Sequence, residues 1–189
     1  MSAKPGELRI IGGEWRSRKL PVAEVPGLRP TPDRVRETLF NWLQADIAGA
    51  RCLDLFAGSG ALGLEAASRG SREVVMVEAD ARAQHNLAAN IVLLKAQQVQ
   101  LVRSEALNWL QQPHAPFDVV FLDPPYASQL LVPACELLEA HHLLAPGAKI
   151  YLEYPAQHDL PQLPANWQII RGKKAGQVGY YLAQRKDEA

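Results

Sequence analysis

Short runs of strand-forming residues alternate with longer helical runs over most of the chain, from residue 51 to residue 154. The run at 117–122, FDVVFL, is almost continuously apolar, as expected of a strand that is buried on both faces. Strands that alternate with helices in this way predict an α/β fold, with a parallel sheet covered by helices on both sides. The expected strands are residues 52–56, 73–77, 99–102, 117–122 and 149–154, and the expected helices are residues 61–69, 81–94, 106–111 and 130–141.

The N-terminal part departs from this alternation. Residues 8–20 contain Gly12-Gly13 between two arms of strand-forming residues, which predicts a small β-hairpin. A proline-rich connection follows this hairpin. Thr31-Pro32-Asp33 is then typical of a helix start, with Thr31 as the N-cap and Pro32 in the first helical position.

The C-terminal part also predicts a hairpin. Residues 167–170 and 179–182 are strand-like and flank a basic turn that contains glycine.

For the chain as a whole, we expect residues 1–30 to form a basic hairpin and linker, and residues 31–189 to form the main domain.

Composition limits the class of protein. A length of 189 residues suits one ordinary domain, and 48% hydrophobic with 21% charged residues is typical of a globular protein. No apolar run reaches the roughly 18 residues of a membrane span, and no secretory signal is visible. Cys52 and Cys135 lie in apolar stretches, which favours buried, reduced thiols. The five histidines lack the spacing of metal ligands. We therefore expect a cytoplasmic monomer without a metal or a membrane segment.

The net charge of zero hides an uneven distribution. Residues 1–36 hold eight Lys and Arg residues against four acids, so the rest of the chain has an acidic excess. A second basic cluster comprises Arg171, Lys173, Lys174, Arg185 and Lys186. Such clusters either bind nucleic-acid phosphate or are ordinary solvated charge, and the charges alone leave both interpretations open.

A glycine-rich turn after the strand at 52–56 is the first feature that indicates a ligand. In residues 54–63, DLFAGSGALG, a strand ends and a helix begins, so backbone N–H groups can face a bound molecule. The glycines match the dinucleotide fingerprint, whereas Asp-x-Phe-x-Gly-x-Gly is the pattern of S-adenosylmethionine-dependent methyltransferases. Asp54 favours the second interpretation, because a carboxylate complements this cofactor's ammonium group and repels a pyrophosphate. The residues assigned to the cofactor here are Asp54, Phe56, Ala57, Gly58 and Gly60.

Residues after the next two expected strands suit the remainder of an adenosine-bearing ligand. Glu78 follows the strand at 73–77, where a carboxylate can accept hydrogen bonds from both ribose hydroxyls of NAD or of S-adenosylmethionine. Glu105 follows the strand at 99–102, at the position where such folds contact adenine. We therefore add Glu78, Ala79, Glu105 and Ala106 to the expected cofactor site.

The tetrapeptide Asp123-Pro124-Pro125-Tyr126 directly follows the buried strand at 117–122 and indicates the reaction. The two prolines end the strand and stiffen the loop. Asp123 and the carbonyl of Pro124 can both accept from one exocyclic amine, while Tyr126 offers a ring on which a base can stack. During methyl transfer such an amine becomes tetrahedral and cationic, and acceptors aimed at its hydrogens stabilise that charge. We expect these four residues to form the catalytic site.

These motifs make the sequence resemble amino-methyltransferases with a Rossmann-like fold, and the N-terminal part narrows the resemblance. Residues 9–20, RIIGGEWRSRKL, and residues 29–43, RPTPDRVRETLFNWL, are similar to the N-terminal signature of the bacterial RsmD family. Together with residues 54–63, residues 123–126 and Leu152-Glu153-Tyr154, the resemblance covers nearly the whole chain. It implies S-adenosylmethionine as the cofactor and the N2 amine of one guanine in 16S ribosomal RNA as the target. Glu105 departs from the family pattern, in which Asp or Asn is commoner.

The resemblance also implies a fold and a partner. The fold would be a Rossmann-like, mostly parallel central sheet with a C-terminal antiparallel hairpin and a small N-terminal β-hairpin extension. The partner would be 16S ribosomal RNA, either naked or within the assembling 30S subunit. The basic N-terminal segment would lie against the RNA rather than build the core. Its expected RNA-binding residues are Arg9, Arg16, Arg18, Lys19, Arg29, Arg34 and Arg36.

Three other functions remain open from the sequence. An NAD-dependent oxidoreductase would use the glycine pattern but would leave residues 123–126 unexplained. A DNA adenine-N6 methyltransferase would use the same tetrapeptide, although no insertion is large enough for a separate target-recognition segment. A non-catalytic RNA-binding protein would use only the basic ends of the chain.

Overall fold

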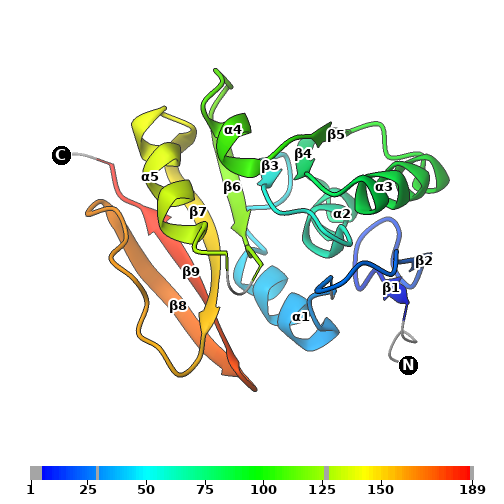
Figure 1. The fold of residues 1–189 in the computed structure, drawn as a ribbon, viewed down its shortest axis with the longest axis horizontal. Helices are drawn as coiled ribbons and strands as arrows, with labels where there is room; N and C mark the ends of the chain where they lie inside the picture. Colours follow the sequence, from blue (N-terminus) through cyan, green and yellow to red (C-terminus); the bar gives the residue numbers. More distant parts are fainter. Residues whose placement is uncertain (1–5, 29, 126–127, 188–189) are drawn as a thin grey trace.

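The computed structural model describes residues 6–28, 30–125 and 128–187. In these ranges the chain forms one large sheet flanked by helices, together with a small separate hairpin (Figure 1). The strands are β1 Glu7–Arg9, β2 Lys19–Pro21, β3 Arg51–Asp54, β4 Glu73–Glu78, β5 Val99–Arg103, β6 Phe117–Leu122, β7 Leu144–Pro155, β8 Trp167–Ala175 and β9 Val178–Arg185. The helices are α1 Asp33–Trp42, α2 Ala61–Ser68, α3 Ala81–Leu94, α4 Ala106–Leu110 and α5 Leu131–Ala140.

The large sheet has the strand order β5-β4-β3-β6-β7-β9-β8. Strands β3 to β7 are parallel, whereas β9 is antiparallel to both β7 and β8. This arrangement confirms the predicted parallel sheet with a C-terminal antiparallel hairpin. From β3 the chain moves outward to β4 and β5 and then returns to β6 on the other side of β3. The order therefore reverses between β3 and β6, which is where open α/β sheets bind their ligands.

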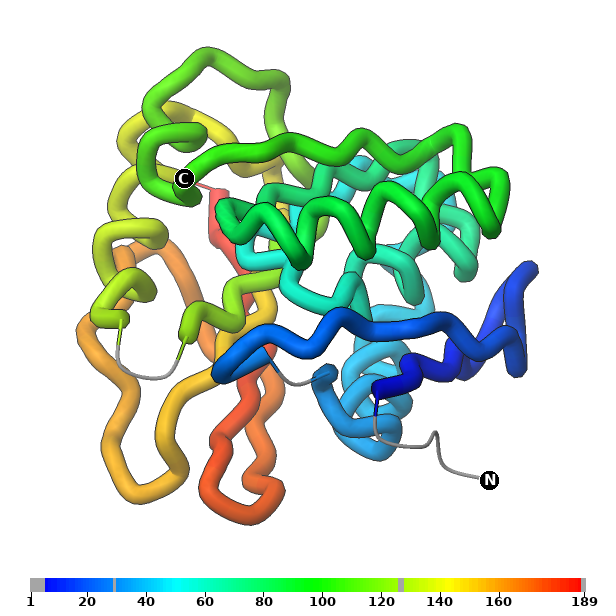
Figure 2. The backbone as a smooth tube through the Cα atoms, turned by 45° about the vertical axis from the view of Figure 1, so that its right-hand side comes forward, coloured from blue at the N-terminus to red at the C-terminus, as the bar shows by residue number. Residues whose placement is uncertain are grey.

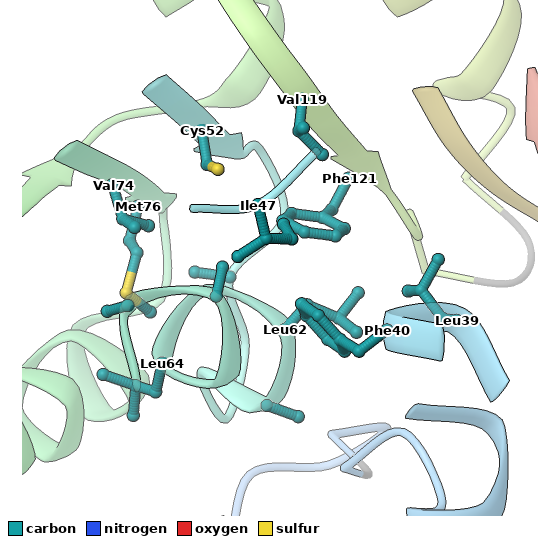
Figure 3. Packing of buried hydrophobic residues seen from close by; sticks show 14 of the residues in the cluster. Leu39, Phe40, Ile47, Cys52, Leu62, Leu64, Val74, Met76, Val119 and Phe121 are labelled. Carbon is teal, nitrogen blue, oxygen red and sulfur yellow. The ribbon is translucent and has the colours of Figure 1, made fainter. Parts of the chain in front are cut away.

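Helices cover both faces of the sheet, because the side chains of each parallel strand alternate between two apolar clusters. On one face, α1, α2 and α3 pack on residues such as Cys52 and Phe121. Figure 3 shows this packing, with Phe40 of α1 lying close to Phe121 of β6. On the other face, α4 and α5 pack on Leu53 and Val120. Both cysteines are buried and free.

The N-terminal hairpin is anchored to α2 rather than standing apart from the domain. β1 pairs with β2 through the register Leu8↔Leu20, and both of these leucines are fully buried. In the connection between the strands, the backbone of Trp15 donates to Ser68 Oγ over 3.0 Å. The expectation that this segment builds no core is therefore wrong, because its apolar side chains belong to the same cluster as α1 and α2.

Gly12 and Gly13 form a contact with α2 rather than the turn of a two-residue hairpin. Gly13 has φ +81, and a Cβ on it would lie 2.0 Å from the carbonyl oxygen of Ser68. The close approach to the helix backbone requires glycine at this position. The predicted hairpin exists, but its connection is the long docked segment between Arg9 and Lys19.

The connection after β2 runs beside α3 before it reaches α1 (Figure 2). The Asn86 and Asn90 side-chain amides both donate to the carbonyl oxygen of Pro21 over 2.9 Å. Helix α1 then begins at Asp33 with Pro32 as its N-cap, so the prediction of Thr31 as the N-cap was wrong by one residue. The carbonyl of Thr31 is instead used as an acceptor by the Arg36 side chain.

Candidate active site

The loops that follow β3, β4, β5 and β6 meet at the carboxyl edge of the sheet. They line one cavity of about 640 Å³ at the point where the strand order reverses. Nearly all of the site residues expected from sequence line it. They are Asp54, Phe56, Ala57, Gly58, Glu78, Ala79, Glu105, Ala106, Asp123, Pro124 and Pro125. Tyr126, the fourth expected catalytic residue, lies outside the described residues.

The glycine-rich turn is built around Asp54, the last residue of β3. Its Oδ2 accepts a hydrogen bond of 2.9 Å from the backbone N–H of Gly63, in the first turn of α2. Its Oδ1 is buried and has no partner among the described residues. Burial raises the pKa of Asp54 to about 7; the Gly63 N–H opposes this rise and the charge of Glu78 adds to it. Asp54 is therefore suited to a cationic donor supplied by a ligand.

Two glycines shape the turn in different ways. Gly58 has φ +55 and lines the cavity, and a Cβ there would lie 2.8 Å from Leu28 Cδ1. Gly60 has φ +85 and is the N-cap of α2, and a Cβ there would lie 2.7 Å from Leu87 Cδ2. Gly60 does not line the cavity, so in this structure it serves the turn and the packing beneath it.

Glu78, at the end of β4, holds two neighbouring loops together. Its Oε1 accepts from the backbone N–H of Gly58 and its Oε2 from that of Asp80, both over 2.8 Å. Each carboxylate oxygen has two lone pairs, so each retains one acceptor site, and Glu78 lines the cavity. The carboxylate therefore fixes the glycine turn while it faces the space expected for a ribose.

Glu105 lies farther along the same edge of the sheet. It is the N-cap of α4, although its side chain makes no capping hydrogen bond. Both Glu105 and Ala106 line the cavity. Their contact with an adenine remains a prediction.

Asp123 follows β6 directly and faces the cavity beside Pro124 and Pro125. Its Oδ1 is buried without a partner among the described residues, as in Asp54. Burial raises the pKa of Asp123 well above its usual value, and the charges of Glu153 and Asp54 raise it further. A donor group placed against Asp123 would satisfy this oxygen.

Glu153 is a site residue to which no role was assigned from the sequence. The β6–β7 register pairs Leu122 with Leu152, so Asp123 and Glu153 are the next residues on adjacent parallel strands. Tyr151 Oη donates to Glu153 Oε1 over 2.6 Å. Burial raises the pKa of Glu153, and the bond from Tyr151 opposes this rise. The parallel pairing that brings these carboxyl groups together is long-range, so the local pattern did not reveal it.

The proline-rich connection is a second part of the site that the sequence analysis missed. Residues 25–28 and 30–32 line the cavity together with the loops at the sheet edge, and Ala175 and Val178 of the C-terminal hairpin also line it. The prolines predicted an extended segment but not where it would run.

The expected RNA-binding residues separate into three groups. Arg16, Arg18, Lys19 and Arg34 are exposed, and Arg9 is half-buried. Arg29 lies outside the described residues. The assignment of Arg36 was wrong, because only 1% of its side chain is exposed and it pairs with Glu65 over 3.1 Å.

Two further properties concern the residues that the structure describes. They contain no group of three or more His, Cys, Asp or Glu residues arranged to hold a metal ion. Their helices are all too short or too polar to cross a membrane.

Comparison with known proteins supports the class that this arrangement indicates, a methyltransferase with a Rossmann-like fold. The solved structure of yhhF from Escherichia coli, which is named as a methyltransferase, has a TM-score of 0.90 at 49% identity and covers 96% of this chain and 99% of that one. Ribosomal RNA small subunit methyltransferase D of Escherichia coli is 51% identical over 181 residues, which are 96% of this chain and 91% of that protein. The protein of the same name in Haemophilus influenzae is 46% identical over 184 residues, covering 95% and 94%.

The family model described as conserved hypothetical protein 95 matches residues 8–184. The chain belongs to this family, the RsmD family.

Proposed function

We propose that this protein transfers a methyl group from S-adenosylmethionine to the exocyclic N2 amine of one guanine in 16S ribosomal RNA. The observation that carries this proposal is the shared cavity. The glycine-rich turn with Asp54 and the Asp123-Pro124-Pro125 loop line the same 640 Å³ space. A methyl donor and an acceptor amine held there are close neighbours, and such positioning supplies much of a transfer reaction's acceleration.

The cavity fits the proposed cofactor on the chemistry of its own residues. The unpartnered Oδ1 of Asp54 is matched by an ammonium group, which is a donor and a cation. Gly58 leaves room for the cofactor close to the backbone, and Glu78 retains acceptor sites for ribose hydroxyls. The cofactor, when bound, supplies an electrophilic methyl group on a sulfonium.

The residues after β6 act on the target amine. In guanine the N2 lone pair is delocalised into the ring, so the amine is a weak nucleophile until its geometry changes. Asp123 and the carbonyl of Pro124 accept from its two hydrogens, which orients the nitrogen and stabilises the positive charge that develops on it. One of these protons then passes from the nitrogen to the carboxylate of Asp123, whose raised pKa suits a proton acceptor, and the neutral methylated amine remains.

The RNA substrate is supported by the relatives and by the surface of the chain. The relatives from Escherichia coli and Haemophilus influenzae are named as ribosomal RNA small subunit methyltransferases. Exposed basic residues at Arg16, Arg18, Lys19 and Arg34 suit RNA phosphates. The partner is naked 16S ribosomal RNA or the assembling 30S subunit, in the cytoplasm.

Transfer of labelled methyl to 16S ribosomal RNA and to 30S particles, followed by nucleoside analysis, tests the proposal. The expected product is N2-methylguanosine, and the comparison of the two substrates shows which of them the enzyme uses. N6-methyladenosine as the product, or no transfer to either substrate, would contradict it. Fluorescence titration with NADH is the matching test of the oxidoreductase alternative, and we expect no binding.

A further inference from the structure

We propose that Glu153 accepts a hydrogen bond from the N1–H of the target guanine and thereby makes the site selective for guanine. This inference rests on the proposed function, because it concerns how the same site recognises its base. It assigns a specificity role to a residue on β7, next to the Asp-Pro-Pro loop.

The position of Glu153 is fixed by the sheet. β7 lies between β6 and β9 (Figure 1), where Glu153 pairs with Tyr180 of β9 on one side and is the neighbour of Asp123 on the other. Trp42 of α1 stacks on Tyr180 with ring centroids 5.5 Å apart. The backbone of Glu153 is therefore held by strands on both sides.

Glu153 also lies where two cavities share their lining. It lines the 640 Å³ cavity and, together with Pro124 and Pro125, a second cavity of about 390 Å³. The second cavity extends from these shared residues toward Tyr154 and His158. A base that extends from the second cavity into the cofactor space therefore contacts residues that line both, Glu153 among them.

One oxygen of Glu153 is engaged by the protein and the other is not. Tyr151, whose side chain is buried, donates to Oε1 over 2.6 Å and so fixes the orientation of the carboxylate. Oε2 makes no hydrogen bond to the described residues, so it can serve a ligand. Asp123 Oδ1 beside it is a second acceptor without a partner in the same part of the chain.

Two acceptors side by side match guanine and mismatch the other bases that carry an exocyclic amine. On its Watson–Crick edge guanine presents two adjacent donors, N1–H and the N2 amine. Adenine and cytosine present a ring nitrogen acceptor beside the amine, and this nitrogen would face a carboxylate oxygen without a hydrogen between them. A buried acceptor left unpaired costs more than a hydrogen bond contributes, so the pair rejects those bases.

The charges of the two carboxylates also favour guanine over the other bases. Burial raises the pKa values of both Asp123 and Glu153, and the charge of Glu153 raises the pKa of Asp123 further. A base edge with two donors, placed against Asp123 and Glu153, relieves the repulsion between the two carboxylates, because each ionised group then has a hydrogen-bond donor as its partner. A base with an acceptor at this position would leave the repulsion in place.

The experiment compares guanosine with 2-aminopurine at the methylated position of reconstituted 30S particles or 16S ribosomal RNA. 2-Aminopurine keeps the N2 amine and lacks N1–H. We expect the wild-type protein to prefer guanosine by about 10- to 100-fold in kcat/KM, the value of one charge-assisted hydrogen bond. We expect Glu153→Gln to reduce this preference about tenfold, mainly by losing rate on guanosine, while the Kd for S-adenosylmethionine stays unchanged.

Glu136→Gln is the matched control, because it makes the same chemical change at an exposed position on α5. It should keep the wild-type preference. 2-Aminopurine also lacks the O6 of guanine. This difference is the same for every variant, so it cancels when the preference for guanosine is compared between variants.

The outcomes separate this inference from the proposed function. Absence of transfer to guanosine by the wild-type protein would overturn the proposed function and this inference with it. Transfer to guanosine with an unchanged preference in Glu153→Gln would overturn this inference alone and leave Glu153 as a partner of Tyr151 only. Should that variant not fold, equal use of guanosine and 2-aminopurine by the wild-type protein would still overturn it, and a clear preference would support it.

Discussion

Two carboxylate oxygens at the cavity, Asp54 Oδ1 and Asp123 Oδ1, are buried and lack partners among the described residues. Leaving such an atom unpaired costs about 1–3 kcal/mol, so folded proteins keep few of them. Both lie where the strand order reverses, at the ends of the adjacent strands β3 and β6. They are best explained as acceptors for a ligand, Asp54 for the cofactor and Asp123 for the target amine.

These two residues could be predicted from the sequence because Asp54 ends an apolar strand and Asp123 directly follows one. The last residue of a parallel strand lies at the ligand-binding edge whatever the rest of the fold does. Glu153 could not be predicted in this way. Its role depends on the β6–β7 register and on the hydroxyl of Tyr151, and neither is written in the local pattern.

The affinity for S-adenosylmethionine should depend on pH through Asp54. Its pKa of about 7 is raised, so below pH 7 the carboxyl is protonated and pairing with an ammonium group must first release that proton. Affinity should therefore increase up to about tenfold per pH unit toward pH 7 and then level off. Isothermal titration between about pH 5.5 and 7.5 measures this dependence.

The same raised pKa stabilises the ligand-free protein at low pH, and this contribution is lost as the pH rises through about 7. Asp54→Asn is the control for both effects, since it should bind weakly with little pH dependence. An affinity that is flat across this range in the wild-type protein would remove Asp54 from contact with the ammonium group.

At the scale of elements, the N-terminal hairpin and α1 are joined to α2 by one buried carboxylate. Glu65 accepts from the backbone N–H groups of Ile11 and Gly12, from Arg36 and from Arg69, all within 3.1 Å. Burial lowers the pKa of Arg36, and the charges of Glu65 and Asp33 oppose this decrease. The guanidinium therefore remains paired within the core.

The sequence predicted the hairpin and the helix but not this junction. A basic residue in a basic segment resembles a surface residue. The burial of Arg36 depends on partners that include Asp33 nearby and Glu65, 29 positions later, and the second of these is not visible in the local pattern. In the same way Gly12-Gly13 matched a turn, whereas its glycines serve contact with a helix that follows far along the chain.

Arg36→Ala should destabilise the protein by about 3–5 kcal/mol, because it leaves Glu65 buried with an incomplete set of partners. Arg34→Ala, two positions earlier on the exposed side of α1, should change stability by no more than about 0.5 kcal/mol. Urea unfolding of both variants measures the difference. Similar small losses in the two would show that the junction contributes little to stability.

At the scale of the whole molecule, two of the sequence clusters of exposed basic residues lie on different elements. One set, Arg16, Arg18 and Lys19, belongs to the N-terminal hairpin, and the other, Arg171, Lys173 and Lys174, lies on the edge strand β8. The sequence predicted both clusters but could not rank them as RNA contacts. Lysines on an edge strand also prevent pairing with other sheets, which is a sufficient reason for the second set.

Replacing Arg16, Arg18 and Lys19 together by alanine should weaken RNA binding and reduce the slope of log K against log salt by about 2. The matched triple replacement of Arg171, Lys173 and Lys174 should change the slope by less than about 1. Filter binding across a series of salt concentrations gives both slopes. The reverse order of effects would place the RNA on the C-terminal hairpin.

The alternation of strands and helices was sufficient to predict the parallel sheet, and the sheet in turn predicted where the loops would meet. The part of the cavity lined by residues 25–28 and 30–32 was not predictable, because tertiary packing places this segment there. In the proposed reaction this cavity holds the cofactor while Asp123 acts on the target amine of the RNA.

Single-turnover methyl transfer by Asp123→Ala, at saturating RNA and cofactor, measures the contribution of Asp123 to the reaction of that amine. The expected rate is about 100- to 1000-fold below wild type, because one preorganised acceptor for the developing positive charge is lost. The Kd for S-adenosylmethionine should stay unchanged, and Asp159→Ala, the same change at an exposed position, should transfer normally. Transfer by Asp123→Ala at the wild-type rate would contradict the account, and loss of cofactor binding alone would reassign Asp123 to the cofactor.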